Sequence, residues 1–202
     1  MKKNYSEQEL IEILKNKYKS VIDNDNPTDE RVIHSIGVYE MALKLNQLHK
    51  LNVSEEKIKI AALLHDYSKY DGVDSIKQIL KENNMEFDET ISPKLWHSLY
   101  GPLFIKRDLG IDDEEILNAI YYHSTGRANM TNLEKLIYLS DYTETKTRSG
   151  DIFEKCRKAS FVSLDKGVAL EAEYTYSRLK EKGIEPKGDT LDAYNYYKKY
   201  LD

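Results

Sequence analysis

The chain has 202 residues, a formal net charge of −5 and a hydrophobic content of 40%, which is the composition of a soluble globular protein. No apolar run is long enough to span a bilayer, and the acidic balance argues against general nucleic-acid binding. Cys156 is the only cysteine, which excludes an internal disulfide and a thiolate zinc site. Since the first residues lack the apolar stretch of a signal peptide, we expect a cytoplasmic protein that binds neither nucleic acid nor membrane.

Helical periodicity dominates the first half of the chain, and no segment alternates as a strand does. Apolar residues three and four apart follow capping residues at Ser6, Thr28 and Ser54. These signals predict helices over 6–18, 28–49, 54–66 and 74–83, with a turn over 24–27. Ser92 followed by Pro93 predicts an N-cap and first helical residue of another helix, which ends at Gly110.

The second half continues in the same way. A helix is predicted from residue 112 or 113 to near Gly126, and Thr131 with Glu134 forms a capping box that starts the next. One long helix is predicted over 153–182, with Gly183 behind it, and a last one over 190–200. Because we find no repeat, low-complexity tract or clear linker, residues 1–202 are expected to form one all-α domain.

Four of the five histidines and two aspartates form a spaced series. It consists of His34, His65, Asp66, His97, His123 and Asp141. Each lone member shares a helix face with apolar residues and is expected to point toward the core. One such histidine alone is most simply a hydrogen-bonded core residue, whereas several imidazoles and carboxylates converging in an interior favour a compensating cation. Nitrogen and oxygen ligands suit Zn, Mn or Fe, so the series predicts a metal-dependent hydrolase.

The order H…HD…H…H…D resembles the HD superfamily of metal-dependent phosphohydrolases. The neighbouring residues are similar to those of the YqeK family, which are bacterial symmetrical diadenosine tetraphosphate hydrolases. The similar blocks are Arg31–Ser35, Ala61–Tyr70, Leu95–Gly101, Tyr121–Gly126 and Tyr138–Glu144, with a weaker one at Ile184–Leu191. The resemblance implies an HD-domain helical bundle.

The resemblance also implies a ligand set. His34, His65, Asp66 and Asp141 would ligate iron, as one or two ions, with Mn or another divalent metal as the alternative. His97 and His123 would either complete a second metal position or hold a phosphate, and we favour phosphate contact. In the reaction Asp66 would orient the attacking hydroxide, while the two further histidines would stabilise charge on the phosphoryl oxygens.

Basic and polar residues near the series are expected to bind the substrate. A single arginine or lysine is most simply a solvated surface charge, but Arg31, Lys69 and Arg148 together could neutralise a polyphosphate. The resemblance extends the nucleotide site to a larger set of residues. They are Arg31, Lys69, Tyr70, His97, His123, Ser124, Asp141, Arg148, Pro186 and Thr190.

The reaction that the resemblance implies is hydrolysis of diadenosine tetraphosphate at its central anhydride, which yields two molecules of ADP. One alternative is an HD phosphatase acting on nucleoside monophosphates, cyclic nucleotides or guanosine polyphosphates. Another is a catalytically silent module that binds nucleotides or stores metal. The expected partners are the dinucleoside polyphosphate and ADP, and self-association as a homodimer stays open.

Overall fold

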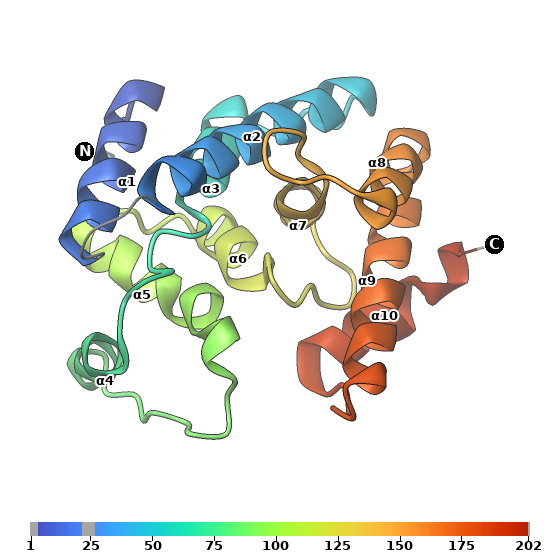
Figure 1. Ribbon diagram of the computed structural model, residues 1–202. Coiled ribbons are helices and arrows are strands. Elements are labelled where there is room, and N and C mark those ends of the chain that lie inside the picture. Colours follow the sequence, from blue (N-terminus) through green and yellow to red (C-terminus); the bar gives the residue numbers. More distant parts are fainter. Residues whose placement is uncertain (1–3, 22–26, 202) are drawn as a thin grey trace.

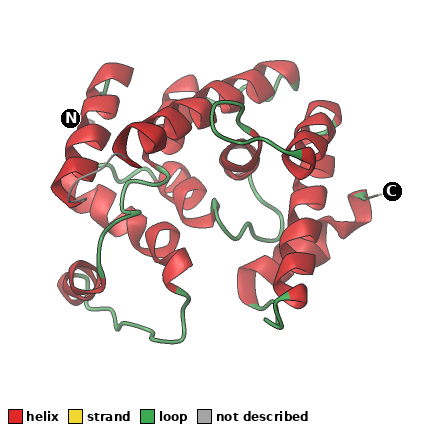
Figure 2. Ribbon diagram, viewed as in Figure 1, coloured by secondary structure: helices red, strands yellow, loops and turns green. Residues whose placement is uncertain are grey.

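The computed structural model describes residues 4–21 and 27–201, in which every regular element is helical (Figures 1 and 2). Most of the turn expected over 24–27 lies outside these residues. The helices are α1 (Glu7–Val21), α2 (Pro27–Leu48), α3 (Glu55–Leu64), α4 (Val73–Glu82), α5 (Trp96–Leu109), α6 (Glu114–Tyr122), α7 (Asn132–Thr143), α8 (Asp151–Val162), α9 (Leu164–Glu181) and α10 (Gly188–Tyr197), with short 3₁₀ turns at Pro93–Leu95 and Lys198–Tyr200. Across the described ranges, no helix combines the length and apolar character that a bilayer crossing requires.

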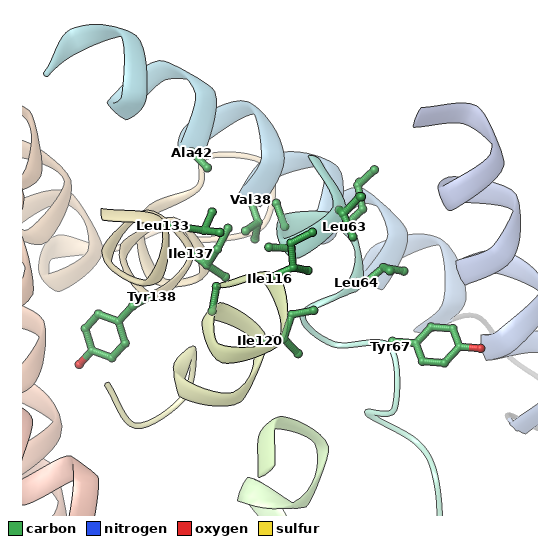
Figure 3. Packing of buried hydrophobic residues seen from close by; sticks show 14 of the residues in the cluster. Val38, Ala42, Leu63, Leu64, Tyr67, Ile116, Ile120, Leu133, Ile137 and Tyr138 are labelled. Atoms are coloured by element: carbon green, nitrogen blue, oxygen red, sulfur yellow. The ribbon is translucent and has the colours of Figure 1, made fainter. Parts of the chain in front are cut away.

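Four helices, α2, α3, α6 and α7, pack against one another around the centre of the molecule. Figure 3 shows the buried apolar side chains that they contribute, among them Val38, Ala42, Leu63, Ile116, Ile120, Leu133 and Ile137. α1 covers α2 and α3, α5 packs against α6, and α8 and α9 pack against α7. The all-α fold expected from the sequence is therefore confirmed, and its central helices are those that carry most of the histidine–aspartate series.

Several predicted helix starts are confirmed by their capping bonds. Ser6 Oγ accepts from the backbone N–H of Glu9, whose carboxylate accepts from the backbone of Ser6 at 2.8 Å. The same reciprocal pair joins Thr131 and Glu134 at the start of α7. Ser54 caps α3 by accepting from the third residue of that helix. These side chains satisfy backbone donors that a helix start otherwise leaves unpaired.

The prediction of one long helix over 153–182 is wrong, because two helices meet at Ser163. The backbone of Ser163 is extended (φ −159°, ψ 136°), and its side chain accepts from the N–H of Lys166 to cap α9. Gly167 lets α9 pack closely on α8, since a Cβ there would lie 2.8 Å from the Cβ of Ser160. Apolar periodicity continues across this junction, which explains why the pattern alone missed the break.

The helix predicted from Ser92 also starts differently. The Ser92 side chain makes no capping hydrogen bond, and Pro93 opens a 3₁₀ turn instead of the α-helix. α5 begins at Trp96, which places His97 in its first turn. Its predicted end is confirmed, because Gly110 adopts the left-handed conformation (φ 69°) that closes a helix.

Candidate metal centre and phosphate site

Two histidines of the series share one local geometry that aims the same ring nitrogen inward. His65 follows α3 and His123 follows α6, and each lies in a helical C-cap conformation. In each ring Nδ1 lies 2.7 Å from the carbonyl oxygen three residues earlier, of Ala62 and Ile120 respectively. A carbonyl can only accept, so Nδ1 carries the proton and Nε2 keeps its lone pair. The two imidazoles thus present Nε2 as a ligand atom.

A first donor group consists of His34, His65 and Asp141, from α2, the end of α3, and α7. Their ligand atoms lie within 4.8 Å of one another, and Nε2 of His34 is 2.9 Å from Oδ1 of Asp141. Both histidines are fully buried, yet neither Nε2 atom has a hydrogen-bond partner within the described residues. Buried polar atoms normally have one. Converging donors with unused lone pairs are what a cation bound at about 2.0–2.2 Å requires.

A second donor group consists of His65, Asp66 and His123, so that His65 belongs to both. Oδ2 of Asp66 lies 3.6 Å from Nε2 of His65, and Oδ1 lies 3.6 Å from Nε2 of His123. His97 adjoins this group, with its Nε2 3.1 Å from Oδ1 of Asp66 and 3.2 Å from Nε2 of His123. The six members of the series therefore converge on one interior region, whose two donor groups could hold divalent cations.

Burial and neighbouring charges shift the pKa values of the histidines and aspartates in this region, and both aspartates stay ionised. Burial lowers the pKa of His65 to about 3, so this imidazole is neutral at pH 7. Burial acts against ionisation of Asp66, but His65 and Lys69 hold its pKa well below the ordinary value. The His34 imidazole, whose Nε2 lies 2.9 Å from Oδ1 of Asp141, acts in the same way on the pKa of that carboxyl. Burial lowers the pKa of His34, yet the nearby carboxylates outweigh it and raise this pKa to about 9. In the metal-free protein these carboxylates therefore hold a proton on His34, which a divalent cation bound at the same place would displace.

Three basic side chains lie beside the donor groups, and each forms an ion pair with a carboxylate of the series. Nζ of Lys69 lies 3.2 Å from Oδ1 of Asp66, and a guanidinium nitrogen of Arg31 lies 3.3 Å from Oδ2. Arg148 donates to Oδ1 of Asp141 at 2.9 Å and to its backbone oxygen at 3.0 Å. These side chains keep about 30% of their surface exposed (31%, 30% and 31% for Arg31, Lys69 and Arg148). They form a positively charged rim that suits an incoming phosphate chain.

The remaining predicted substrate residues divide into two sets. Ser124 lies at the centre, with Oγ 3.0 Å from Nε2 of His123, and Tyr70 hydrogen-bonds to Arg31. No described hydrogen bond or ion pair joins Pro186 or Thr190 to the series. Pro186 is buried and Thr190 is partly buried in the segment that leads into α10. A place for these two residues in the nucleotide site therefore stays a prediction.

Sequence reasoning gave no role to Glu144, the residue that ends α7. Its carboxylate is fully buried, and Oε1 lies 3.2 Å from Nδ1 of His34. Its position in the sequence could not reveal this contact, because the pairing depends on how the loop after α7 folds back. One sequence signal was present: a charged residue one helical turn after Asp141, on the same helix face.

Residues 31–146 match the HD domain family. The chain is 34% identical over 172 residues to the symmetrical bis(5'-nucleosyl)-tetraphosphatase of Bacillus subtilis, covering 84% of this chain and 90% of that protein. The protein of the same name from Staphylococcus aureus is 35% identical over 173 residues, covering 84% and 87%.

A solved structure has the same fold over nearly the whole length of this chain. It is the crystal structure of a predicted HD superfamily hydrolase involved in NAD metabolism from Clostridium acetobutylicum, with a TM-score of 0.83 and 32% identity over 98% of this chain and 99% of that one. The segment 31–146 contains all six residues of the series and Glu144. The chain therefore belongs to the HD domain family, together with the symmetrical bis(5'-nucleosyl)-tetraphosphatases that it resembles over most of their length.

Proposed function

We propose that this protein is a metal-dependent hydrolase that cleaves diadenosine tetraphosphate symmetrically into two molecules of ADP. The observation that carries the proposal is the pair of donor groups that share His65, enclosed by three basic side chains. The names of the relatives from two bacterial species, each covered over more than four fifths of its length, support the same substrate. We further propose that residues 1–202 act as one domain in the cytoplasm, the setting that the single cysteine favours.

The donor set fits a divalent cation, because it combines neutral imidazole and ionised carboxylate and leaves buried Nε2 atoms unused. We propose iron, as one or two ions, with Mn or another divalent metal as the alternative. Cys156 is buried in α8 and cannot add a soft ligand, which leaves oxygen and nitrogen donors. When bound, such a cation would polarise a phosphoryl oxygen and make a water molecule nucleophilic at neutral pH.

The protein's own residues position the reactants. Arg31, Lys69 and Arg148 neutralise the polyphosphate and hold it against the donor groups. Asp66 orients the attacking water, and His97 and His123 contact the equatorial oxygens of the phosphorus under attack. The water oxygen forms a bond to that phosphorus while the bridging P–O bond breaks. The bridging oxygen leaves with the other ADP, and the proton of the water is released.

Product analysis tests this proposal. Protein purified without oxygen is analysed for bound metal and then incubated with diadenosine tetraphosphate, a nucleoside monophosphate, a cyclic nucleotide and a guanosine polyphosphate. We expect ADP as the only product of the first compound, formed at least tenfold faster than any other hydrolysis. A mixture of ATP and AMP would contradict symmetrical cleavage. Faster release of phosphate from another nucleotide would favour a different HD phosphatase, and binding without turnover would favour a silent module.

A further inference from the structure

We propose that Glu144 is a positioning residue that fixes the ring of His34 so that its Nε2 atom faces the first donor group. The two nitrogens of His34 face opposite partners: Nδ1 lies 3.2 Å from Oε1 of Glu144, and Nε2 lies 2.9 Å from Oδ1 of Asp141. A carboxylate that accepts the Nδ1 proton leaves the lone pair on Nε2. Glu144 therefore acts on the metal centre through His34, without being a ligand itself.

The loop after α7 holds this carboxylate in place with backbone and hydroxyl donors. Oε2 accepts from the N–H of Lys146 at 2.5 Å, and both oxygens accept from the N–H of Thr147 at 3.1 Å. The hydroxyl of Thr147 also donates to Oε1. With a fully buried side chain and this many donors, Glu144 has little freedom to leave the imidazole. The carboxylate is thus pre-oriented before any cation binds.

Two residues from other helices make room for this arrangement and brace it. A Cβ on Gly37 of α2 would lie 2.5 Å from Oε2 of Glu144, so only glycine leaves space for the carboxylate. Arg157 of α8 donates to the backbone oxygens of Thr143 at 2.7 Å and Glu144 at 3.0 Å. The carboxylate and the backbone of Glu144 are therefore held together by the loop after α7, by α2 and by α8.

The inference rests on the proposed metal centre but not on the proposed substrate, and its test needs no nucleotide. The affinity of the metal-free protein for Mn²⁺ is measured by competition with a chelating dye, and folding is measured separately by thermal unfolding of the metal-free form. We expect Glu144→Ala to weaken metal binding by about 10–100-fold. Glu134→Ala is the matched control, because it removes another buried carboxylate from α7 that lies in a capping box. That control should lower the unfolding temperature and leave the affinity unchanged.

Double mutants separate positioning from general damage. If Glu144 acts through His34, adding Glu144→Ala to His34→Ala should weaken metal binding no further. Gly37→Ala retains the carboxylate but displaces it, so it should also weaken metal binding, and this loss should disappear when Glu144 is already alanine. Gly37→Ala serves as the test if Glu144→Ala does not fold.

Three results would overturn the inference. One is an unchanged affinity in both Glu144→Ala and Gly37→Ala. Another is a loss that adds fully to that of His34→Ala. The third is an unmodified protein that binds no divalent metal, which would also remove the metal centre from the proposed function. Normal metal binding without hydrolysis of diadenosine tetraphosphate would contradict the proposed substrate alone.

Discussion

Nε2 of His34 lies 2.9 Å from Oδ1 of Asp141, yet the pair lacks the geometry of a hydrogen bond from that nitrogen. The two atoms come from α2 and α7, which pack against each other in the core. Both are directed at the same space as Nε2 of His65, which is 4.0 Å from the same carboxylate oxygen. A shared cation explains this convergence, because it would pair the buried Nε2 atoms of the two histidines, for which the described residues supply no hydrogen bond.

Metal binding should stabilise the fold, since the donor groups assemble only in the native state. At a free metal concentration one hundred times Kd, the gain is about 2.7 kcal/mol. In a domain of this size, that corresponds to an increase in Tm of roughly 5–10 °C. A chelator should reverse the increase, and His65→Ala should abolish it. Thermal unfolding with and without Mn²⁺ measures the effect, and an equal increase in the variant would contradict the assignment of His65.

Loss of Asp66 should mainly affect turnover. Its two oxygens contact Lys69, Arg31 and His97, so it lies between the donor groups and the basic rim. We expect Asp66→Ala to lower kcat by roughly 10³-fold. Circular dichroism should show an intact helical fold. Near-normal turnover in this variant would refute its role at the reacting phosphorus.

Arg148 should act on substrate binding. Its guanidinium donates to Asp141 and remains 31% exposed, which leaves donors for a phosphate oxygen. Removing a charged hydrogen-bond donor costs about 1.5–3 kcal/mol, so Arg148→Ala should raise KM by roughly tenfold or more. Arg107→Ala is the control, because Arg107 pairs with Asp108 and Glu82 instead of the series. An unchanged KM in Arg148→Ala would exclude a substrate contact there.

Stability should fall with rising pH because of Glu171. This side chain of α9 is only 5% exposed, and among the described residues its Oε2 atom has no hydrogen-bond partner. Burial raises its pKa well above the ordinary value, and nearby Asp141 raises it further. Above about pH 4.5, the folded carboxyl therefore holds a proton that the unfolded chain has lost, so stability is present at low pH and is lost as the pH rises toward the folded pKa.

Glu171→Gln should remove this dependence, because the amide stays neutral. The metal-free variant should match the unmodified protein at pH 5 and exceed its free energy of unfolding by about 1–3 kcal/mol at pH 8. Urea unfolding at both pH values measures the difference. Glu181→Gln, at the exposed end of α9, controls for the loss of a surface charge. Equal pH slopes for Glu171→Gln and the unmodified protein would contradict a protonated Glu171.

The sequence predicted the helices and the members of the series because both depend on local patterns. Capping residues such as Ser54 and Thr131 act within one helical turn, and the apolar faces that carry His34 and His123 can be read from spacing. The break at Ser163 and the contact of Glu144 with His34 depend on tertiary packing, so the local signals, a serine able to cap a helix and a charge one turn after Asp141, did not specify them. How the expected nucleotide contacts and ligand roles divide among these residues stays a prediction.

The most direct test of the account is an anomalous diffraction map of crystals grown from iron-loaded protein. The account predicts one or two iron peaks, with at least one at about 2.0–2.3 Å from the Nε2 atoms of both His34 and His65. A peak bound elsewhere, or none at these atoms in protein that contains stoichiometric iron, would contradict it.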